Sequence, residues 1–132
     1  MNARDLLEKA RRAAVSARML KEAGDADGAC NRGYYAMFDA ARAALLAVGS
    51  SDAELPRTHS GLITAFSLQL VKTGRVPVEL GRALNRAAEI RLIADYKDEP
   101  VDPEQAAWVV EQARVFVEAM QAAFLPGEGD PA

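Results

Sequence analysis

Apolar residues recur along most of the chain at the three- and four-residue spacing of an α-helix. Such spacing gathers apolar side chains on one face of the helix. The clearest stripe lies near the N-terminus and consists of Leu6, Leu7, Ala10, Ala13, Ala14, Ala17 and Leu20. The strict alternation of apolar and polar residues that is typical of strands is nearly absent. The pattern therefore predicts an all-α protein.

Glycine, proline and capping residues divide this pattern into five helices. Gly24 and Gly74 end helical stretches, and Asp102 followed by Pro103 is a typical helix start. The predicted helices cover about residues 3–23, 25–48, 58–73, 77–97 and 102–124. Their short links predict an up-and-down helical bundle of four to five antiparallel helices. We expect one domain over residues 1–125 and a flexible C-terminal tail over residues 126–132.

The second predicted helix, residues 25–48, carries small residues where a surface helix would carry large ones. Its ridge consists of Ala29, Gly33, Ala36, Ala40, Ala43, Ala44 and Ala47. A helix that is apolar on most sides is a central one, and small residues let other backbones approach it closely. A remaining strip carries Arg32, Tyr35 and Asp39 at helical spacing. An arginine, a phenol and a carboxylate thus lie in line on a helix predicted to be central.

The fourth predicted helix, residues 77–97, places an arginine among apolar residues. On a helical wheel Arg91 falls in the middle of the stripe of Leu80, Leu84, Ala87 and Ala94. Asp95 lies beside Arg91, whereas Tyr96 lies on the opposite, polar side with Arg82, Asn85 and Glu89. A guanidinium in a core needs a carboxylate, a wet cleft or an interface, because its burial alone costs several kcal/mol.

These residues define a candidate polar cluster, made of Arg32, Tyr35, Asp39, Arg91 and Asp95. The cluster has two interpretations. It is either a buried ion-pair network that fixes the register of the helices, or a cleft that faces a nucleotide or an RNA phosphate. The second fits the arginine fork, which binds phosphate oxygens in pairs. The sequence alone does not establish that the two helices face each other.

The amino-acid composition and the distribution of charge limit what kind of protein this is. Half of the 132 residues are apolar and 27% are charged, which is typical of a soluble domain. Residues 56–97 hold seven basic and three acidic side chains, whereas residues 98–132 hold one and eight. This asymmetry fits solvated helix faces, a polar partner surface or self-association, but overall charge does not indicate nucleic-acid binding.

The rare residues exclude further classes. A single cysteine, Cys30, and a single histidine, His59, provide no zinc pattern, so we expect no metal and no cofactor. One cysteine and no membrane-length apolar run favour a cytoplasmic protein without membrane association. Cys30 reads as a small core residue, and His59 as a packed or capping residue at a helix start. We find no phosphate-binding glycine loop and no nucleophile motif.

Three blocks of the sequence resemble the small prokaryotic branch of the HEPN superfamily, the higher eukaryotes and prokaryotes nucleotide-binding domain. They are NRGYYAMFDAARAAL, RTHSGLITAFSLQLVKTG and LNRAAEIRLIADYKDEPV, and the similarity runs over about residues 3–125. The resemblance implies a helical bundle that forms a homodimer. It also implies pairing with a minimal nucleotidyltransferase, often as a toxin–antitoxin module. Many members are ribonucleases that need no metal.

The ribonuclease motif of that superfamily is an arginine, an adjacent polar residue and a histidine four to six residues on. Here the arginine maps to Arg91, the adjacent residue is Leu92, and Tyr96 stands at the histidine position. The sole histidine lies outside the motif. Histidine transfers protons near neutral pH, whereas tyrosine and aspartate are poorer bases there.

The leading hypothesis is therefore a non-catalytic or weakly catalytic HEPN protein that binds a nucleotide or an RNA phosphate. The alternative is a metal-independent ribonuclease toxin that uses Arg91 with Tyr96 or Asp95 as catalytic residues. The resemblance further implies that a partner nucleotidyltransferase could adenylylate Tyr96, the tyrosine nearest the motif.

Overall fold

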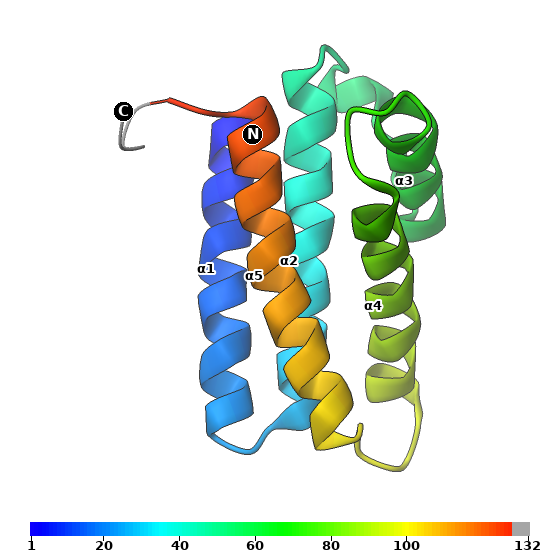
Figure 1. Cartoon of the computed structure of the whole chain (residues 1–132). Helices are drawn as coiled ribbons and strands as arrows, with labels where there is room; N and C mark the ends of the chain where they lie inside the picture. Colours follow the sequence, from blue (N-terminus) through cyan, green and yellow to red (C-terminus); the bar gives the residue numbers. More distant parts are fainter. Residues whose placement is uncertain (128–132) are drawn as a thin grey trace.

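The computed structural model describes residues 1–127 and consists of antiparallel helices (Figure 1). The α-helices are α1 (Ala3–Glu22), α2 (Ala26–Ala47), α3 (His59–Phe66), α4 (Val78–Tyr96) and α5 (Pro103–Phe124). Two short elements, the 3₁₀ turn η1 (Asp52–Glu54) and the π-helical turn η2 (Ser67–Val71), flank α3. No strand occurs in the described part of the chain. The predicted all-α bundle is confirmed.

The helices begin where the sequence supplies a cap. Asn2 and Asp5 form a capping box at α1, because each side chain accepts a hydrogen bond from the other residue's backbone N–H. Asp25 accepts from the Gly28 N–H at the start of α2, directly after Gly24, which has a φ of 87°. Asp102 caps α5, and Pro103 occupies its first turn. These local signals explain why the predicted boundaries lie within a residue or two of those observed.

The third predicted helix differs from its prediction. Residues 58–73 were expected to form one α-helix, but α3 ends at Phe66 and the chain continues as the π turn η2. The Lys72 N–H bonds to the Ser67 carbonyl five residues back, at 2.8 Å, which is the π pattern. This wider turn keeps both Phe66 and Leu70 buried. Residues 128–132 of the predicted C-terminal tail lie outside the described residues.

Helix α2 is the central element, as its small residues predict. It packs against α1, α4 and α5, and in Figure 1 it runs behind α5, between α1 and α4. Its buried small residues are Ala29, Cys30, Gly33, Ala36, Ala40, Ala41, Ala43 and Ala44. A Cβ atom on Gly33 would lie 2.8 Å from Val109 Cγ1, so α5 approaches α2 more closely than any larger residue would allow. Because its small residues allow such close packing, α2 can contact several helices at once.

The core is formed by the inward faces of all the α-helices. Its largest fully buried side chains include Tyr34, Phe66 and Phe116. Cys30 is also fully buried, and burial raises the pKa of its thiol to about 11, as befits an inert core residue. Within residues 1–127, no helix is both long and apolar enough to cross a bilayer. Among the large, fully buried side chains of residues 1–127, Tyr34 is the one with a hydroxyl group, and this group reaches the candidate site.

Candidate functional site

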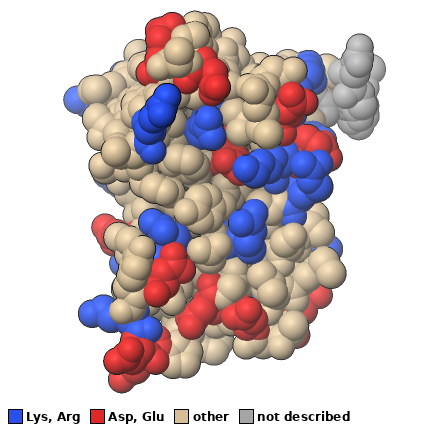
Figure 2. Space-filling model, turned by 180° about the vertical axis from the view of Figure 1, so that it is seen from behind, with Lys and Arg blue, Asp and Glu red and all other residues tan. Residues whose placement is uncertain are grey.

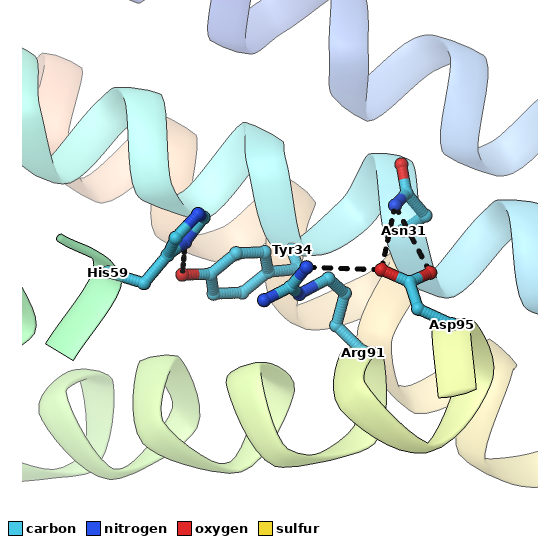
Figure 3. A network of polar contacts seen from close by, with 5 residues as sticks. All are labelled: Asn31, Tyr34, His59, Arg91 and Asp95. Carbon is cyan, nitrogen blue, oxygen red and sulfur yellow. Dashed lines mark hydrogen bonds and ion pairs between the residues drawn. The ribbon is translucent and has the colours of Figure 1, made fainter. Parts of the chain in front are cut away.

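Arg91 projects from α4 toward α2 and makes two kinds of contact there, an ion pair and cation–π contacts. Its Nη1 lies 3.1 Å from Asp95 Oδ2, one helical turn further on. Its guanidinium carbon lies 5.1 Å from the centre of the Tyr34 ring and 5.8 Å from that of Tyr35, within cation–π range. Asn31 of α2 donates to both oxygens of Asp95 at 3.4 and 3.5 Å (Figure 3). Helices α2 and α4 therefore face each other at Arg91.

Tyr34 extends this network to α3. Its side chain is fully buried, and its hydroxyl lies 2.6 Å from Nδ1 of His59 (Figure 3). Burial raises the pKa of the phenol to about 12, although the charge of Arg91 opposes the rise, so Tyr34 keeps its proton near neutral pH. We assign the phenol as the donor and Nδ1 as the acceptor, because a buried phenolic proton needs an acceptor. The imidazole proton then resides on Nε2.

Arg91 and His59 line one groove between α2, α3 and α4, which we call the Arg91 groove. Its volume is about 480 Å³. Its lining consists of Tyr34, His59, Ser60, Ile63, Thr64, Asn85, Ala88, Glu89, Arg91 and Leu92. The one carboxylate in this set, Glu89, lies 3.4 Å from Arg86. The groove thus combines a cation, a neutral imidazole, hydroxyl groups and apolar walls.

The guanidinium of Arg91 is not fully satisfied by the protein. Its side chain is only 12% exposed, and its Nε is buried without a hydrogen-bond partner in the described residues. Leaving a buried donor unpaired costs about 1–3 kcal/mol. The ion pair with Asp95 therefore leaves part of the guanidinium without a hydrogen-bond acceptor among the described residues.

The surroundings of His59 favour its neutral form. Burial, and secondly the nearby charge of Arg91, lower its pKa from the ordinary value of 6.5. The imidazole packs against Phe38 with ring centres 4.7 Å apart and planes tilted by 33°, and against Tyr35 edge to face at 5.7 Å. Near neutral pH the site thus presents an uncharged imidazole within a group of aromatic rings.

The residues of the predicted polar cluster divide between two places. Arg91 and Asp95 pair, and Tyr35 lies between Arg91 and Arg32, whose guanidinium carbon is 5.9 Å from the Tyr35 ring. Asp39 is only 4% exposed and does not line the Arg91 groove. Burial raises the pKa of Asp39, and the charges of Lys9, Arg42 and Arg32 oppose that rise. Asp39 therefore lies among one cation of α1, Lys9, and two of α2, Arg32 and Arg42.

Tyr96 does not belong to the groove. Its side chain is 76% exposed, as its place on the polar side of the wheel predicts, and it is not among the groove-lining residues. Sequence patterns do not single out Tyr34 or Asn31. Of the two roles expected for His59, packed or capping, it is packed against Phe38 and Tyr35. Thr58 supplies the cap of α3 instead, through the Gly61 N–H. One local signal does point to His59: it directly follows the capping residue Thr58, so it lies at the N-terminal end of α3, where anions are favoured.

Comparison with known proteins places the chain in a family. The model of the HEPN domain matches residues 3–123, which include α1 to α4 and nearly all of α5. The chain belongs to the HEPN family. Within the described residues, no group of three or more His, Cys, Asp or Glu side chains is arranged to hold a metal.

Curated relatives come from bacteria and archaea. UPF0332 protein glr0978 of Gloeobacter violaceus is 39% identical over 92 residues, 70% of each chain. The protein named "Putative toxin MJ0142" of Methanocaldococcus jannaschii is 30% identical over 113 residues, 85% of this HEPN chain and 74% of its own. "Putative toxin MJ0605" of the same organism is 32% identical over 92 residues, 70% and 66% of the two chains.

The environment of His59 predicts its titration. As the only histidine, it gives one set of imidazole signals, and we expect a pKa below 6.5 by NMR. Arg91→Gln should raise that pKa, because it removes a positive charge that disfavours imidazolium. Arg114→Gln, which changes the same charge on α5, should leave it unchanged. A wild-type pKa at or above 6.5 would contradict this environment.

The lowered pKa of His59 also makes the free energy of unfolding depend on pH. As the pH falls, the unfolded chain binds a proton at His59 at a higher pH than the folded chain does. The contribution of His59 to the free energy of unfolding is therefore complete above pH 6.5 and decreases as the pH falls through that value.

Proposed function

We propose that this protein is a toxin-type HEPN protein that binds the phosphate of a nucleotide or of RNA in the Arg91 groove. The observation that carries this proposal is the nearly buried Arg91, which lines the groove and retains an unpaired donor. The family match and the names of the two Methanocaldococcus jannaschii relatives support the toxin assignment.

The chemistry of the groove suits a phosphodiester. Arginine offers a planar set of donors that binds two phosphate oxygens at once, and the Tyr34 and Tyr35 rings hold its orientation. Helix α3 begins at His59, so the positive end of its dipole lies beside the same groove. The Nε2–H of a neutral His59 is a further donor for a phosphate oxygen.

The groove supports binding better than catalysis. Asp95 is engaged by Arg91 and Asn31, and the exposed Tyr96 does not reach the groove lining. These are the residues that the motif would offer for acid–base work. His59 lies beside Arg91, but Nδ1 accepts from Tyr34, which leaves Nε2 protonated and unsuited to act as a base. We therefore propose a non-catalytic or weakly catalytic protein.

Arg91→Gln tests phosphate binding. We expect the affinity for a labelled single-stranded RNA, measured by fluorescence anisotropy, to fall about ten- to a hundredfold, because a hydrogen bond to a charged group is worth about 1.5–3 kcal/mol. Arg114→Gln removes the same charge from an exposed site on α5 and should bind like the wild type. Equal affinity of the wild type and Arg91→Gln would refute the proposal. Denaturing gels of the same samples, without metal, test for ribonuclease activity.

We further propose that the protein forms a homodimer and binds a minimal nucleotidyltransferase. The support is the family membership, together with exposed apolar side chains on α4 outside the Arg91 groove that a partner could cover, such as Ile93 and Tyr96. Tyr96 is accessible enough to be adenylylated, with 76% of its surface exposed. Its phenolic oxygen would attack the α-phosphate of ATP, with pyrophosphate as the leaving group.

Co-expression with a nucleotidyltransferase encoded beside this gene tests that pairing. The two chains should elute together from a sizing column, and this chain alone should elute as a dimer. Incubation with the partner and ATP should add one AMP to the intact mass, which Tyr96→Phe should prevent and Tyr35→Phe should not. Separate elution of the two chains would refute the pairing, and AMP addition to Tyr96→Phe would refute the assigned tyrosine.

A further inference from the structure

A second hollow adjoins the Arg91 groove on the far side of an aromatic pair. This hollow, which we call the Arg57 hollow, has a volume of about 320 Å³. It is lined by Phe38, Arg42, Asp52, Leu55, Pro56 and Arg57. Phe38 lines the Arg57 hollow and His59 lines the Arg91 groove, and their ring centres are 4.7 Å apart. The two hollows are therefore neighbours, separated by the Phe38–His59 pair.

The rings at this boundary are only partly covered by the protein. Phe38, His59 and Tyr35 are each half-buried, and each contacts the other two, with ring centres between 4.7 and 6.2 Å apart. Half-buried aromatic rings that cluster beside arginines are the usual surface on which unpaired nucleobases stack. Because its pKa is lowered, His59 adds a neutral ring to this surface.

Arginines lie on both sides of the aromatic boundary. Arg91 lies in the groove, and Arg42 and Arg57 line the hollow. Arg42 is 3.4 Å from Asp52, whereas Arg57 has no ion pair with any described residue. Figure 2 shows the side of the molecule opposite the viewpoint of Figure 1, where Lys and Arg side chains, interspersed with Asp and Glu, surround an uncharged area. Arginines on both sides of the aromatic boundary suit a strand that carries one phosphate per nucleotide.

We propose that the Arg91 groove and the Arg57 hollow are successive subsites for one single-stranded polynucleotide. One phosphate binds at Arg91, a base stacks on Phe38 and His59, and a further phosphate binds at Arg57. The ligand is a strand of several nucleotides, because a nucleoside monophosphate carries a phosphate on one side of its base only and so fills at most one of the two arginine sites. A duplex fits the stacking site poorly, since its bases are already stacked on one another. This inference rests on the phosphate site proposed above.

The test is binding of a labelled 12-nucleotide oligouridylate by fluorescence anisotropy. Phe38→Leu keeps an apolar side chain but removes the stacking ring, and should weaken binding about five- to a hundredfold. Arg57→Gln should weaken binding and lower the slope of log affinity against log salt by about one contact. The matched controls Phe124→Leu and Arg114→Gln make the same changes away from both hollows and should bind like the wild type.

Two competitors test the ligand class. Uridine monophosphate should compete at least a hundredfold more weakly than the unlabelled 12-mer, and a 12-base-pair RNA duplex at least tenfold more weakly. Equal competition by either of them would overturn the inference. Urea unfolding of Phe38→Leu shows whether the variant is still folded when its binding is measured. Arg57 is exposed, so Arg57→Gln leaves the core intact.

The outcomes separate this inference from the proposed function. If Arg91→Gln weakens binding but Phe38→Leu and Arg57→Gln do not, the phosphate site stands and the strand-length site is refuted. If Arg91→Gln has no effect, the phosphate site itself is refuted, and the inference fails with it. If all three variants weaken binding and the controls do not, both hollows belong to one binding site.

Discussion

The contact between Arg91 and the face of α2 determines how the site of this protein is built. A guanidinium that is 12% exposed must be compensated, and here a carboxylate on its own helix and two aromatic rings on α2 compensate it in part. The compensation is incomplete, because Nε has no partner in the described residues. The protein therefore keeps a strong anion-binding group in place without neutralising it fully, at some cost in stability.

Helix α2 makes this arrangement possible because most of its own surface is made of small residues. Alanines and Gly33 let α1 and α5 approach closely, as the contact of Gly33 with Val109 illustrates. The large side chains of α2, Tyr34, Tyr35 and Phe38, are then left to face α3 and α4. The packing that forms the core on one side thus forms the aromatic wall of the site on the other. His59 completes that wall because Tyr34, buried in the core, needs an acceptor for its hydroxyl.

Much of the fold could be predicted from the sequence because its signals are local. Helical periodicity, the glycines Gly24 and Gly74 that end helical stretches, and Asp102 before Pro103 each depend on residues close in the chain. The pairing of Arg91 with Asp95 was predictable for the same reason, since both lie on one helix. The π turn after Phe66 was missed because no local signal distinguishes it from a continuing α-helix.

The site was harder to predict because it depends on how whole helices are rotated about their axes. Tyr34 and His59 are 25 residues apart, and no spacing rule brings them together. The sequence pattern assigned Tyr35 to the polar strip of α2 and did not single out Tyr34. Both rings contact Arg91, because α4 packs over both positions. Asp39, on the same strip as Tyr35, lies farther along α2 and falls under the influence of Lys9 on α1.

The central claim is that Arg91 is retained for binding and not for folding. The double variant Arg91→Met/Asp95→Leu tests it most directly, because it replaces the ion pair by apolar side chains of similar size. Our account predicts a free energy of unfolding in urea within about 1 kcal/mol of the wild type, or higher, since such replacements are often neutral or stabilising. A loss of about 3 kcal/mol or more would show that the ion pair is a structural element and would contradict the account.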